Sequence, residues 1–150
     1  MSETHVLIVD DDPVNVDILM EALDNCGYIL DSAGDGQEAW DKIQAAPTRY
    51  SAVLLDRMMP IMDGMELLRL IKADPAFKNM PIIMQTAAAM SNQIVEGLDA
   101  GAYYYLIKPF DSQVLLSILR TAIREHEQQN ELRRESATAA DSAYLLQNAQ

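Results

Sequence analysis

Acidic residues stand at the ends of two apolar runs in this sequence. Asp10, Asp11 and Asp12 follow the run HVLIV, and Asp56 closes the run AVLL directly before RMMPIMDG. A carboxylate at the end of a buried strand is costly unless it is paired or coordinated. Close carboxylates suit a hard cation with oxygen ligands, and an aspartate can also act as a nucleophile toward phosphorus. We therefore expect Asp56 to be either a turn residue or the reactive group of a site built from distant parts of the chain.

Two further apolar runs end in groups that could stabilise a phosphoryl group. PIIMQT ends at Thr86, and YYYLI is followed by Lys108. Negative charge spreads over the oxygens of a phosphoryl group during transfer, and a hydroxyl or an ammonium stabilises that charge. Taken singly, each residue is more often an ordinary strand end or a solvated charge. Their joint placement, each at the end of its own run, favours one shared site.

These residues need a scaffold in which the ends of the runs meet. The expected strands are 5–10, 28–33, 51–56, 81–86 and 103–107. They are nearly continuous apolar runs, which is typical of a parallel sheet covered on both faces. Stretches with apolar residues at helical spacing separate them, so right-handed crossovers predict a flavodoxin-like α/β fold, a doubly wound (βα)5 sheet of five parallel strands. Ligands of such sheets bind beyond the carboxyl ends of the strands.

Start and stop signals mark the helices between the expected strands. Asp12 precedes Pro13, and Asp35 and Asp63 each stand three residues before a glutamate. All three aspartates are therefore expected to cap helices. Gly27 is expected to end the first helix, because glycine readily adopts the left-handed conformation found after helix ends.

The composition changes near residue 125. Residues 126–135 permit a helix but contain one large apolar side chain, Leu132, so they are expected to extend the last helix into solvent. Residues 136–150 have the composition of a flexible tail or linker. We therefore expect one domain over 1–125, followed by a helical extension and tail over 126–150.

The overall composition argues against several classes of protein. The 150 residues include 23 acidic and 11 basic side chains, and the formal net charge of −12 argues against a nucleic-acid-binding surface. No apolar run is long enough to cross a bilayer, and the N-terminus lacks the pattern of a signal peptide. The single cysteine, Cys26, cannot form an internal disulfide. A cytoplasmic protein without direct contact to nucleic acid or membrane is the simplest interpretation.

Several stretches together resemble the receiver domain of response regulators in bacterial two-component signalling, of the kind found in chemotaxis and sporulation regulators. They are VLIVDDD, LLDRMMPIMDG, the threonine of MQTAA, GAYYYLIKPF and the region around Gly36. The resemblance covers about residues 4–125. It implies a phosphoacceptor that takes a phosphoryl group on Asp56, with magnesium, and thereby switches a protein-interaction surface. A receiver catalyses only its own phosphorylation and dephosphorylation, so no enzyme in the ordinary sense is expected.

Carried over by position, the resemblance implies a role for each residue at the strand ends. Asp56 is the implied phosphoacceptor. The implied ligands of Mg²⁺, with Mn²⁺ as an alternative, are Asp10, Asp11, Asp56 and the backbone carbonyl of Met58. The implied contacts of the phosphoryl group are Thr86, Lys108 and the backbone of Ala87. The residues by themselves indicate only that carboxylates, a hydroxyl and an ammonium meet at one edge of a sheet.

The resemblance also implies a two-state switch. Thr86 moves toward the phosphoryl group and the ring of Tyr105 moves into the space, which reorders the face made by the fourth helix, the fifth strand and the fifth helix. Tyr103 is expected on the same face of its strand as Tyr105, and Tyr104 on the opposite face. A cis peptide bond is implied before Pro109.

The implied partners are proteins. A sensor histidine kinase or a histidine phosphotransfer domain would supply the phosphoryl group, and a downstream protein effector would receive the signal. Val14 and Ile18 fall outside the apolar stripe of the first expected helix, so they are expected to form an exposed strip where the phosphodonor docks. The helical extension leaves a homodimer open. In the resembling family the positions of Met58 and Ala88 tune the access of water to the phosphoryl group. Neither side chain can orient a water through a carboxylate or an amide, so self-dephosphorylation is not expected to be fast.

Other readings of the sequence stay open or are disfavoured. The same receiver could be the N-terminal regulatory domain of a longer effector protein, or an inert interaction module. A nucleotide-binding domain is disfavoured because neither a G-x-G-x-x-G nor a P-loop pattern occurs. A magnesium-dependent phosphohydrolase with an aspartyl nucleophile is disfavoured because Pro13 directly follows the three aspartates. We expect no DNA-binding domain within residues 126–150, which are too few to form one.

Overall fold

The computed structural model describes residues 3–87 and 90–148, with side chains as far as residue 132. The strands are β1 (Thr4–Val9), β2 (Tyr28–Ala33), β3 (Tyr50–Asp56), β4 (Ile82–Thr86) and β5 (Tyr104–Ile107). The helices are α1 (Pro13–Ala22), α2 (Gly36–Ala45), α3 (Gly64–Ala73), α4 (Ser91–Asp99) and α5 (Ser112–Asn148). All strand pairs are parallel, in the order β2-β1-β3-β4-β5. The predicted doubly wound five-stranded fold is confirmed.

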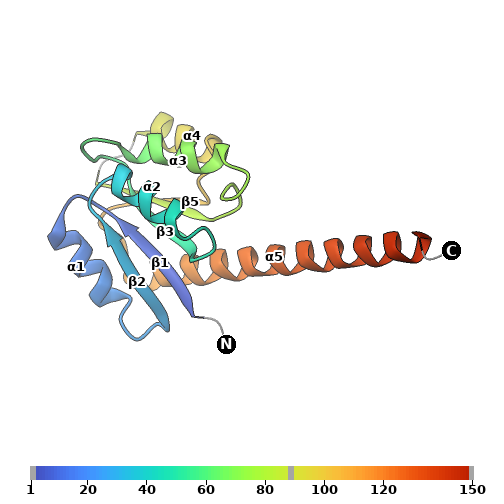
Figure 1. Cartoon of the computed structure of the whole chain (residues 1–150). Helices are drawn as coiled ribbons and strands as arrows, with labels where there is room; N and C mark the ends of the chain where they lie inside the picture. Colours follow the sequence, from blue (N-terminus) through green and yellow to red (C-terminus); the bar gives the residue numbers. More distant parts are fainter. Residues whose placement is uncertain (1–2, 88–89, 149–150) are drawn as a thin grey trace.

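Helices cover both faces of the sheet, which explains the continuous apolar runs (Figure 1). Along β1, Val6 and Ile8 pack with side chains of α1 and α5, whereas Leu7 and Val9 pack with side chains of α2 and α3. All four are fully buried. Because each successive side chain points to the opposite face, a strand buried on both faces has no polar alternation.

The three expected helix caps are present. The carboxylate of Asp12 accepts a hydrogen bond from the amide of Val14 at 3.0 Å, and that of Asp63 accepts from the amide of Glu66 at 2.9 Å. Asp35 accepts from the amide of Glu38 at 2.8 Å. Each bond satisfies an amide that has no partner within the helix.

The end of α1 differs from the prediction. The helix ends at Ala22, five residues before Gly27, and Asn25 and Gly27 both adopt positive φ angles, 65° and 92°. The two left-handed residues therefore belong to a turn that leads into β2, and Gly27 does not terminate the helix itself. Asparagine tolerates this conformation better than other residues with side chains, which the glycine-based prediction overlooked.

The tyrosine run at β5 also differs from the prediction. The strand begins at Tyr104, and Tyr103 lies just before it and packs against the cluster on the face covered by α1 and α5. Tyr105 belongs to the cluster on the opposite face. The expectation that Tyr103 and Tyr105 share a face is wrong, because residue 103 is not yet part of the extended strand and the alternation of a strand does not apply to it.

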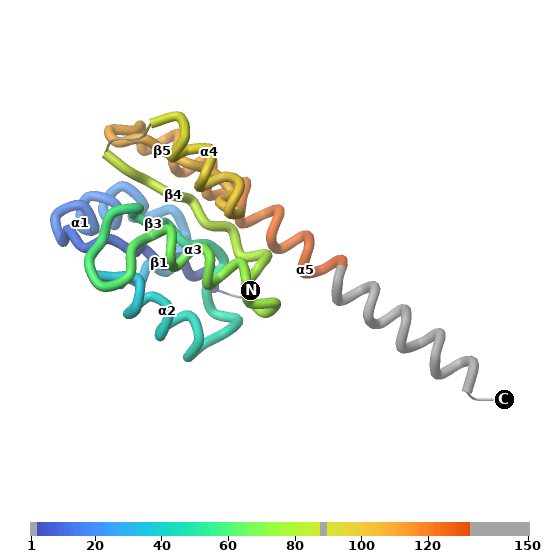
Figure 2. The backbone as a smooth tube through the Cα atoms, turned by 90° about the horizontal axis from the view of Figure 1, so that it is seen from above, coloured from blue at the N-terminus to red at the C-terminus, as the bar shows by residue number. Residues whose placement is uncertain are grey.

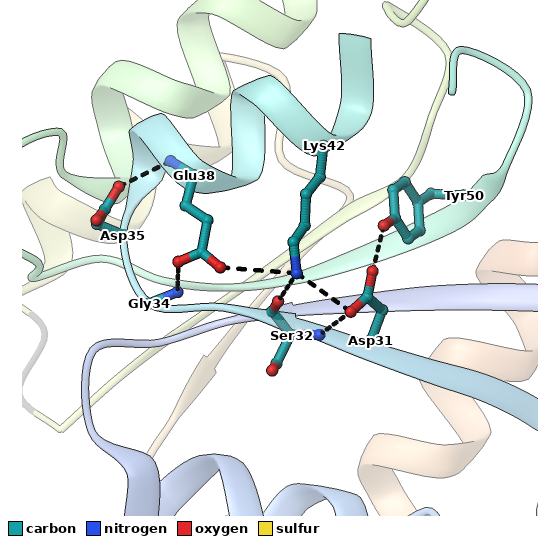
Figure 3. A network of polar contacts seen from close by, with 7 residues as sticks. All are labelled: Asp31, Ser32, Gly34, Asp35, Glu38, Lys42 and Tyr50. Carbon is teal, nitrogen blue, oxygen red and sulfur yellow. Dashed lines mark hydrogen bonds and ion pairs between the residues drawn. The ribbon is translucent and has the colours of Figure 1, made fainter. Parts of the chain in front are cut away.

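A network of polar contacts joins the edge strand β2 to α2 and β3 (Figure 3). The carboxylate of Asp31 accepts from the hydroxyl of Tyr50 at 2.5 Å and from the amide of Ser32 at 2.8 Å, and it lies 3.3 Å from Nζ of Lys42. Lys42 also donates to the carbonyl of Ser32 at 2.5 Å and lies 3.6 Å from a carboxylate oxygen of Glu38. The charges and donors of this network therefore satisfy one another.

The last helix continues well past the sheet (Figures 1 and 2). Its first turns pack on the sheet through Leu115, Leu119 and Ile123. Farther on, Nδ1 of His126 lies 3.0 Å from the carbonyl oxygen of Asn79, and Leu132 is largely exposed. The helix continues through the residues expected to form a tail and reaches Asn148. None of the helices in the described part of the chain is long and apolar enough to span a membrane.

Candidate functional site

The carboxylates of the sequence prediction meet at the carboxyl ends of β1 and β3. These strands are neighbours in the sheet, Asp56 is the last residue of β3, and Asp10 and Asp11 directly follow β1. One carboxylate oxygen from each of the three residues lies within 4.8 Å of the others. Asp10 and Asp56 are buried and Asp11 is exposed. Three oxygens at this spacing are a donor set that fits a magnesium ion.

Neighbouring groups fix the orientation of Asp10. The amide of Asp12 donates to its Oδ1 at 2.9 Å, and the side-chain amide of Asn15 donates to its Oδ2. Nζ of Lys108 lies 3.5 Å from the same Oδ2. The sequence prediction missed Asn15, although its position one helical turn after the aspartates was a usable signal.

The environment of Asp56 opposes its ionisation. Burial raises the pKa of this carboxyl to about 6, and the charges of Asp10 and, more weakly, Asp11 act in the same direction. Lys108, with Nζ 3.8 Å from Oδ1 of Asp56, and the backbone amide of Met58 partly offset that rise in pKa. A bound dication would supply the positive charge that this group of carboxylates lacks.

The ends of β4 and β5 bring in the hydroxyl and the ammonium. Thr86 is buried at the end of β4, and its carbonyl accepts a hydrogen bond from the amide of Lys108 at 2.7 Å. The peptide bond between Lys108 and Pro109 is cis, as expected. Ala87 follows Thr86 and is exposed, whereas Ala88 lies outside the described residues.

The loop after Asp56 closes tightly on its own strand. The amide of Gly64 donates to the carbonyl of Arg57 at 2.9 Å, and a Cβ atom at Gly64 would lie 2.3 Å from the carbonyl oxygen of Asp56. Gly36 is equally confined, because its amide donates to the carbonyl of Met62 and a Cβ there would lie 2.5 Å from that oxygen. Gly64 therefore allows α3 to begin directly beside Asp56, and Gly36 allows α2 to begin against the loop that follows Asp56.

Tyr105, the candidate for the aromatic switch, is buried beneath α4. A Cβ atom at Gly97 of α4 would lie 2.8 Å from its ring. Its hydroxyl accepts a hydrogen bond from Nη1 of Arg57 at 3.2 Å. The sequence prediction did not assign a role to Arg57, because its contact with Tyr105 joins residues 48 positions apart and no local sequence pattern predicts such a contact.

One buried polar side chain next to the site also escaped prediction. Gln85 is paired with Asp56 across β3 and β4 and is 2% exposed. Its Nε2 atom has no hydrogen-bond partner among the described residues. The sequence signal that could have identified this residue is a glutamine at the penultimate position of the otherwise apolar run PIIMQT.

Comparison with known proteins identifies relatives of the chain. The family model for the response regulator receiver domain matches residues 6–120. The response regulator MprA of Mycolicibacterium vanbaalenii is 41% identical over 119 residues, which cover 79% of this chain and 50% of that protein. The transcriptional regulatory protein HprR of Escherichia coli K12 is 31% identical over 137 residues, which cover 91% of this chain and 59% of that protein. The chain thus spans about half the length of the curated relatives it matches.

Solved structures show the same likeness. The chemotaxis protein CheY4 of Vibrio cholerae is 32% identical with a TM-score of 0.73, and the match covers 81% of this chain and 99% of that one. A CheY-like receiver domain protein of Methanospirillum hungatei is 32% identical with a TM-score of 0.75, covering 85% and 99%. The predicted resemblance is therefore confirmed at the level of family and fold.

Proposed function

Because the chain belongs to the response regulator receiver family, we propose that it accepts a phosphoryl group on Asp56 and thereby switches a protein-interaction surface. One observation carries this proposal: the carboxylates of Asp10, Asp11 and Asp56 meet one another and the ammonium of Lys108 at the ends of their strands. An inert interaction module would not need three carboxylates within 4.8 Å of one another, since their mutual repulsion destabilises the fold.

Each residue of the site has a distinct task in the proposed transfer. An oxygen of Asp56 attacks the phosphorus of the donor, and the bond between phosphorus and the donor breaks. Asp10, Asp11, Asp56 and the backbone carbonyl of Met58 would hold Mg²⁺ or Mn²⁺, which supplies positive charge beside the transferred group. Lys108 would stabilise the phosphoryl oxygens from the side of β5, and the hydroxyl of Thr86 and the backbone of Ala87 would do so from the end of β4.

The signal would leave through the face formed by α4, β5 and α5. Thr86 and Tyr105 are the proposed moving parts, and both are buried at the edge of that face. In the described part of these three elements, the exposed large apolar residues are Val95, Leu98, Tyr104, Ile107, Val114 and, farther along α5, Leu132. Exposed apolar side chains on adjacent elements suit a protein partner, so this face would take the downstream effector or a second copy of the chain.

The phosphodonor would dock on α1. Val14 and Ile18 are 65% and 57% exposed, as the sequence predicted. Ile18 also lines a groove of about 420 Å³ that reaches Lys108 and Phe110 beside the site. We expect Val14→Glu with Ile18→Glu to slow transfer from a histidine kinase or a phosphotransfer domain while sparing phosphorylation by a small phosphodonor. Equal slowing of both reactions would contradict this docking site.

A direct test uses acetyl phosphate with magnesium, followed by mass measurement of the intact protein. We expect the mass of one added phosphoryl group in the wild type, none in Asp56→Asn, and an undiminished adduct in Asp63→Asn. Asp63 is the matched control because it caps α3 and asparagine also caps helices well. No adduct in the wild type would favour the inert module, and turnover of a phosphomonoester would favour a hydrolase.

The lifetime of the adduct depends on the entrance to the site. The side chain of Met58 is 70% exposed beside Asp56 and carries no group that orients a water. We expect Met58→Asn combined with Ala88→Glu to speed the loss of phosphate, measured from the decay of the adduct. Unchanged or slower loss would contradict the assignment.

A second candidate function follows from the length of the relatives. The proposed receiver domain covers 1–125, and residues 126–150 would extend it as a helix and linker. Since MprA and HprR are about twice as long as the matched region, the same receiver could regulate an effector domain that follows it. Sequencing the complete reading frame distinguishes the two forms.

A further inference from the structure

One arginine lies between the phosphoacceptor candidate and α4. The guanidinium of Arg57 donates from Nη1 to the backbone carbonyl of Gln93 at 3.0 Å and to the hydroxyl of Tyr105 at 3.2 Å. Its Nη2 donates to Oε1 of Glu96 at 3.2 Å. The side chain of Arg57 is 12% exposed, so these bonds form in a largely desolvated setting where charge-assisted hydrogen bonds are strong.

The backbone of Arg57 is held in place. Its amide donates to the carbonyl of Gln85 on β4 at 3.1 Å, and its carbonyl accepts from the amide of Gly64 at the start of α3 at 2.9 Å. A residue fixed at both backbone groups and joined covalently to Asp56 is a rigid base for its side chain. The position of the guanidinium is therefore tied to the end of β3.

Helix α4 depends on polar contacts for its place on the sheet. Of its nine residues only Gly97 is buried, with Ile94 partly buried against the core, whereas α3 buries five residues. Apolar packing therefore restrains α4 less than α3, and the two bonds from Arg57 to Gln93 and Glu96 add to its attachment. A helix with few buried apolar contacts can shift at low energetic cost when its polar contacts change.

The hydroxyl of Tyr105 needs a partner in its buried position. A buried phenol without a hydrogen bond is destabilised, and Arg57 is the donor that satisfies it here. If the ring turned outward, Arg57 would keep its contacts with Gln93 and Glu96 but lose this one. The arginine therefore favours the inward ring together with the observed place of α4.

We propose that Arg57 is a positioning residue, which holds α4 and the hydroxyl of Tyr105 on one guanidinium and so stabilises the arrangement that favours a phosphoryl group at Asp56. This inference rests on the proposed function, in which Thr86 and Tyr105 respond to that group. Coupling between two parts of a protein is reciprocal: if the phosphoryl group favours the inward ring, then contacts that favour the inward ring raise the affinity for the phosphoryl group.

The test measures the affinity of the full chain for beryllofluoride with magnesium, a stable stand-in for the phosphoryl group. We expect Arg57→Lys to weaken binding by roughly five- to tenfold, the lower end of typical couplings between sites, because lysine cannot hold three partners at once. Arg69→Lys is the matched control. Arg69 also donates to Oε1 of Glu96, at 3.3 Å, but it lies on α3 and is 59% exposed, whereas Arg57 is 12% exposed.

A second variant isolates the contact with the ring and does not depend on the stability of the arginine variant. We expect Tyr105→Phe to weaken beryllofluoride binding by about two- to fivefold, and Arg57→Lys to have a smaller effect in that background than alone. ¹⁹F NMR of protein labelled with fluorotyrosine follows the ring directly, with Tyr105→Phe identifying its signal. In Arg57→Lys that signal is expected to move toward the position of a solvent-exposed ring.

The possible outcomes distinguish a failure of the proposed function from a failure of the proposed role of Arg57. No beryllofluoride binding by the wild type would overturn the proposed function. Normal binding by the wild type, with Arg57→Lys indistinguishable from Arg69→Lys, would overturn the role of Arg57 alone. Strictly additive effects of Arg57→Lys and Tyr105→Phe would also overturn it, because a shared hydrogen bond produces non-additivity.

Discussion

Asp31 on β2 and Asp56 on β3 each lie close to a lysine ammonium, at 3.3 Å and 3.8 Å, yet their surroundings act in opposite directions. Burial alone would raise the pKa of Asp31, but hydrogen bonds from Tyr50 and Ser32 and the charge of Lys42 lower it below its ordinary value (Figure 3). Burial raises the pKa of Asp56 to about 6, and the carboxylate of Asp10 adds to that rise.

The difference between these two regions lies in their neighbours, since both pair an aspartate with a lysine. The network at Asp31 is closed, because its donors and charges offset one another. The cluster at Asp56 holds excess negative charge in a buried setting, which raises its free energy, and a bound cation would lower it. A carboxylate whose environment disfavours its own charge is a candidate for chemistry, whereas a satisfied one is structural.

Replacing Asp56 or Asp31 by asparagine is expected to change the stability of the protein in opposite directions. Asp56→Asn is expected to stabilise the metal-free protein at pH 7.5 by about 3 kcal/mol, because an acid whose pKa is raised from 3.8 to about 6 on folding destabilises the fold progressively as the pH rises through that range. Chemical denaturation in the presence of a chelator measures the effect. At pH 4 the two proteins should converge, and a destabilised variant at pH 7.5 would contradict the argument.

Magnesium provides the second test. At 100 times its dissociation constant, the ion is expected to raise the free energy of unfolding of the wild type by about 2.7 kcal/mol. Asp56→Asn should lose most of this gain because it removes one ligand charge, and Asp31→Asn should retain it. Thermal melts with magnesium and after its removal provide the measurement. Equal gains in all three proteins would place the metal elsewhere.

The third test concerns Asp31 itself. Asp31→Asn is expected to destabilise the protein by about 1 kcal/mol, opposite in sign to Asp56→Asn, because Lys42 loses the nearer of its two carboxylates. The magnitude is small since the side chains of Asp31 and Lys42 are 36% and 35% exposed, so water screens the pair. Denaturant titration at pH 7.5 gives the value, and a stabilised variant would show that the network is not closed.

The region around Asp56, unlike the network at Asp31, also contains a strained backbone residue. Ile61, in the loop that follows Asp56, has a φ angle of 69° and is 80% exposed. A β-branched residue is disfavoured there, so Ile61→Gly is expected to stabilise the protein by about 1 kcal/mol despite the added freedom of the unfolded chain. Asn25→Gly, at a φ angle of 65°, is the control and should be nearly neutral, because asparagine tolerates this conformation. Urea denaturation distinguishes the two.

The smallest expected effect is a pKa change at Tyr50. Burial raises the pKa of this phenol to about 12, and the hydrogen bond to Asp31 contributes to the rise. Stability that depends on the neutral phenol is therefore present below pH 10 and lost as the pH rises toward 12. Asp31→Asn is expected to lower the pKa of Tyr50 by about one unit or less. Ultraviolet titration against Tyr50→Phe measures it, and an unchanged pKa would show that burial alone is responsible.

Elements of the fold were predictable wherever one short segment carries its own signal. The apolar runs placed all five strands, and Asp12, Asp35 and Asp63 marked the starts of three helices correctly. The end of α1 was not predictable in this way, because a turn built on Asn25 competes with the simpler signal of Gly27.

The site shows the same division between local and distant information. Asp10, Asp56 and Lys108 were recognisable because each ends an apolar run, and the topology of the sheet then brings them together. The contact of Arg57 with Tyr105 depends on where α4 packs, which no local pattern encodes. The assigned roles of Thr86, Ala87 and the carbonyl of Met58 stay predictions that the phosphorylation and metal experiments test.

The ion pair between Lys108 and Asp10 has a further consequence for the assembly of the protein. It joins groups 98 positions apart in the sequence, and β1, which ends directly before Asp10, pairs with β2 and β3 and not with β5. Closing so long a loop is entropically costly and must await the completed sheet. A partly folded chain in which β5 has not joined the sheet would therefore lack the ammonium beside Asp10 and Asp56, so the proposed phosphoacceptor site is complete only when the last strand is in place.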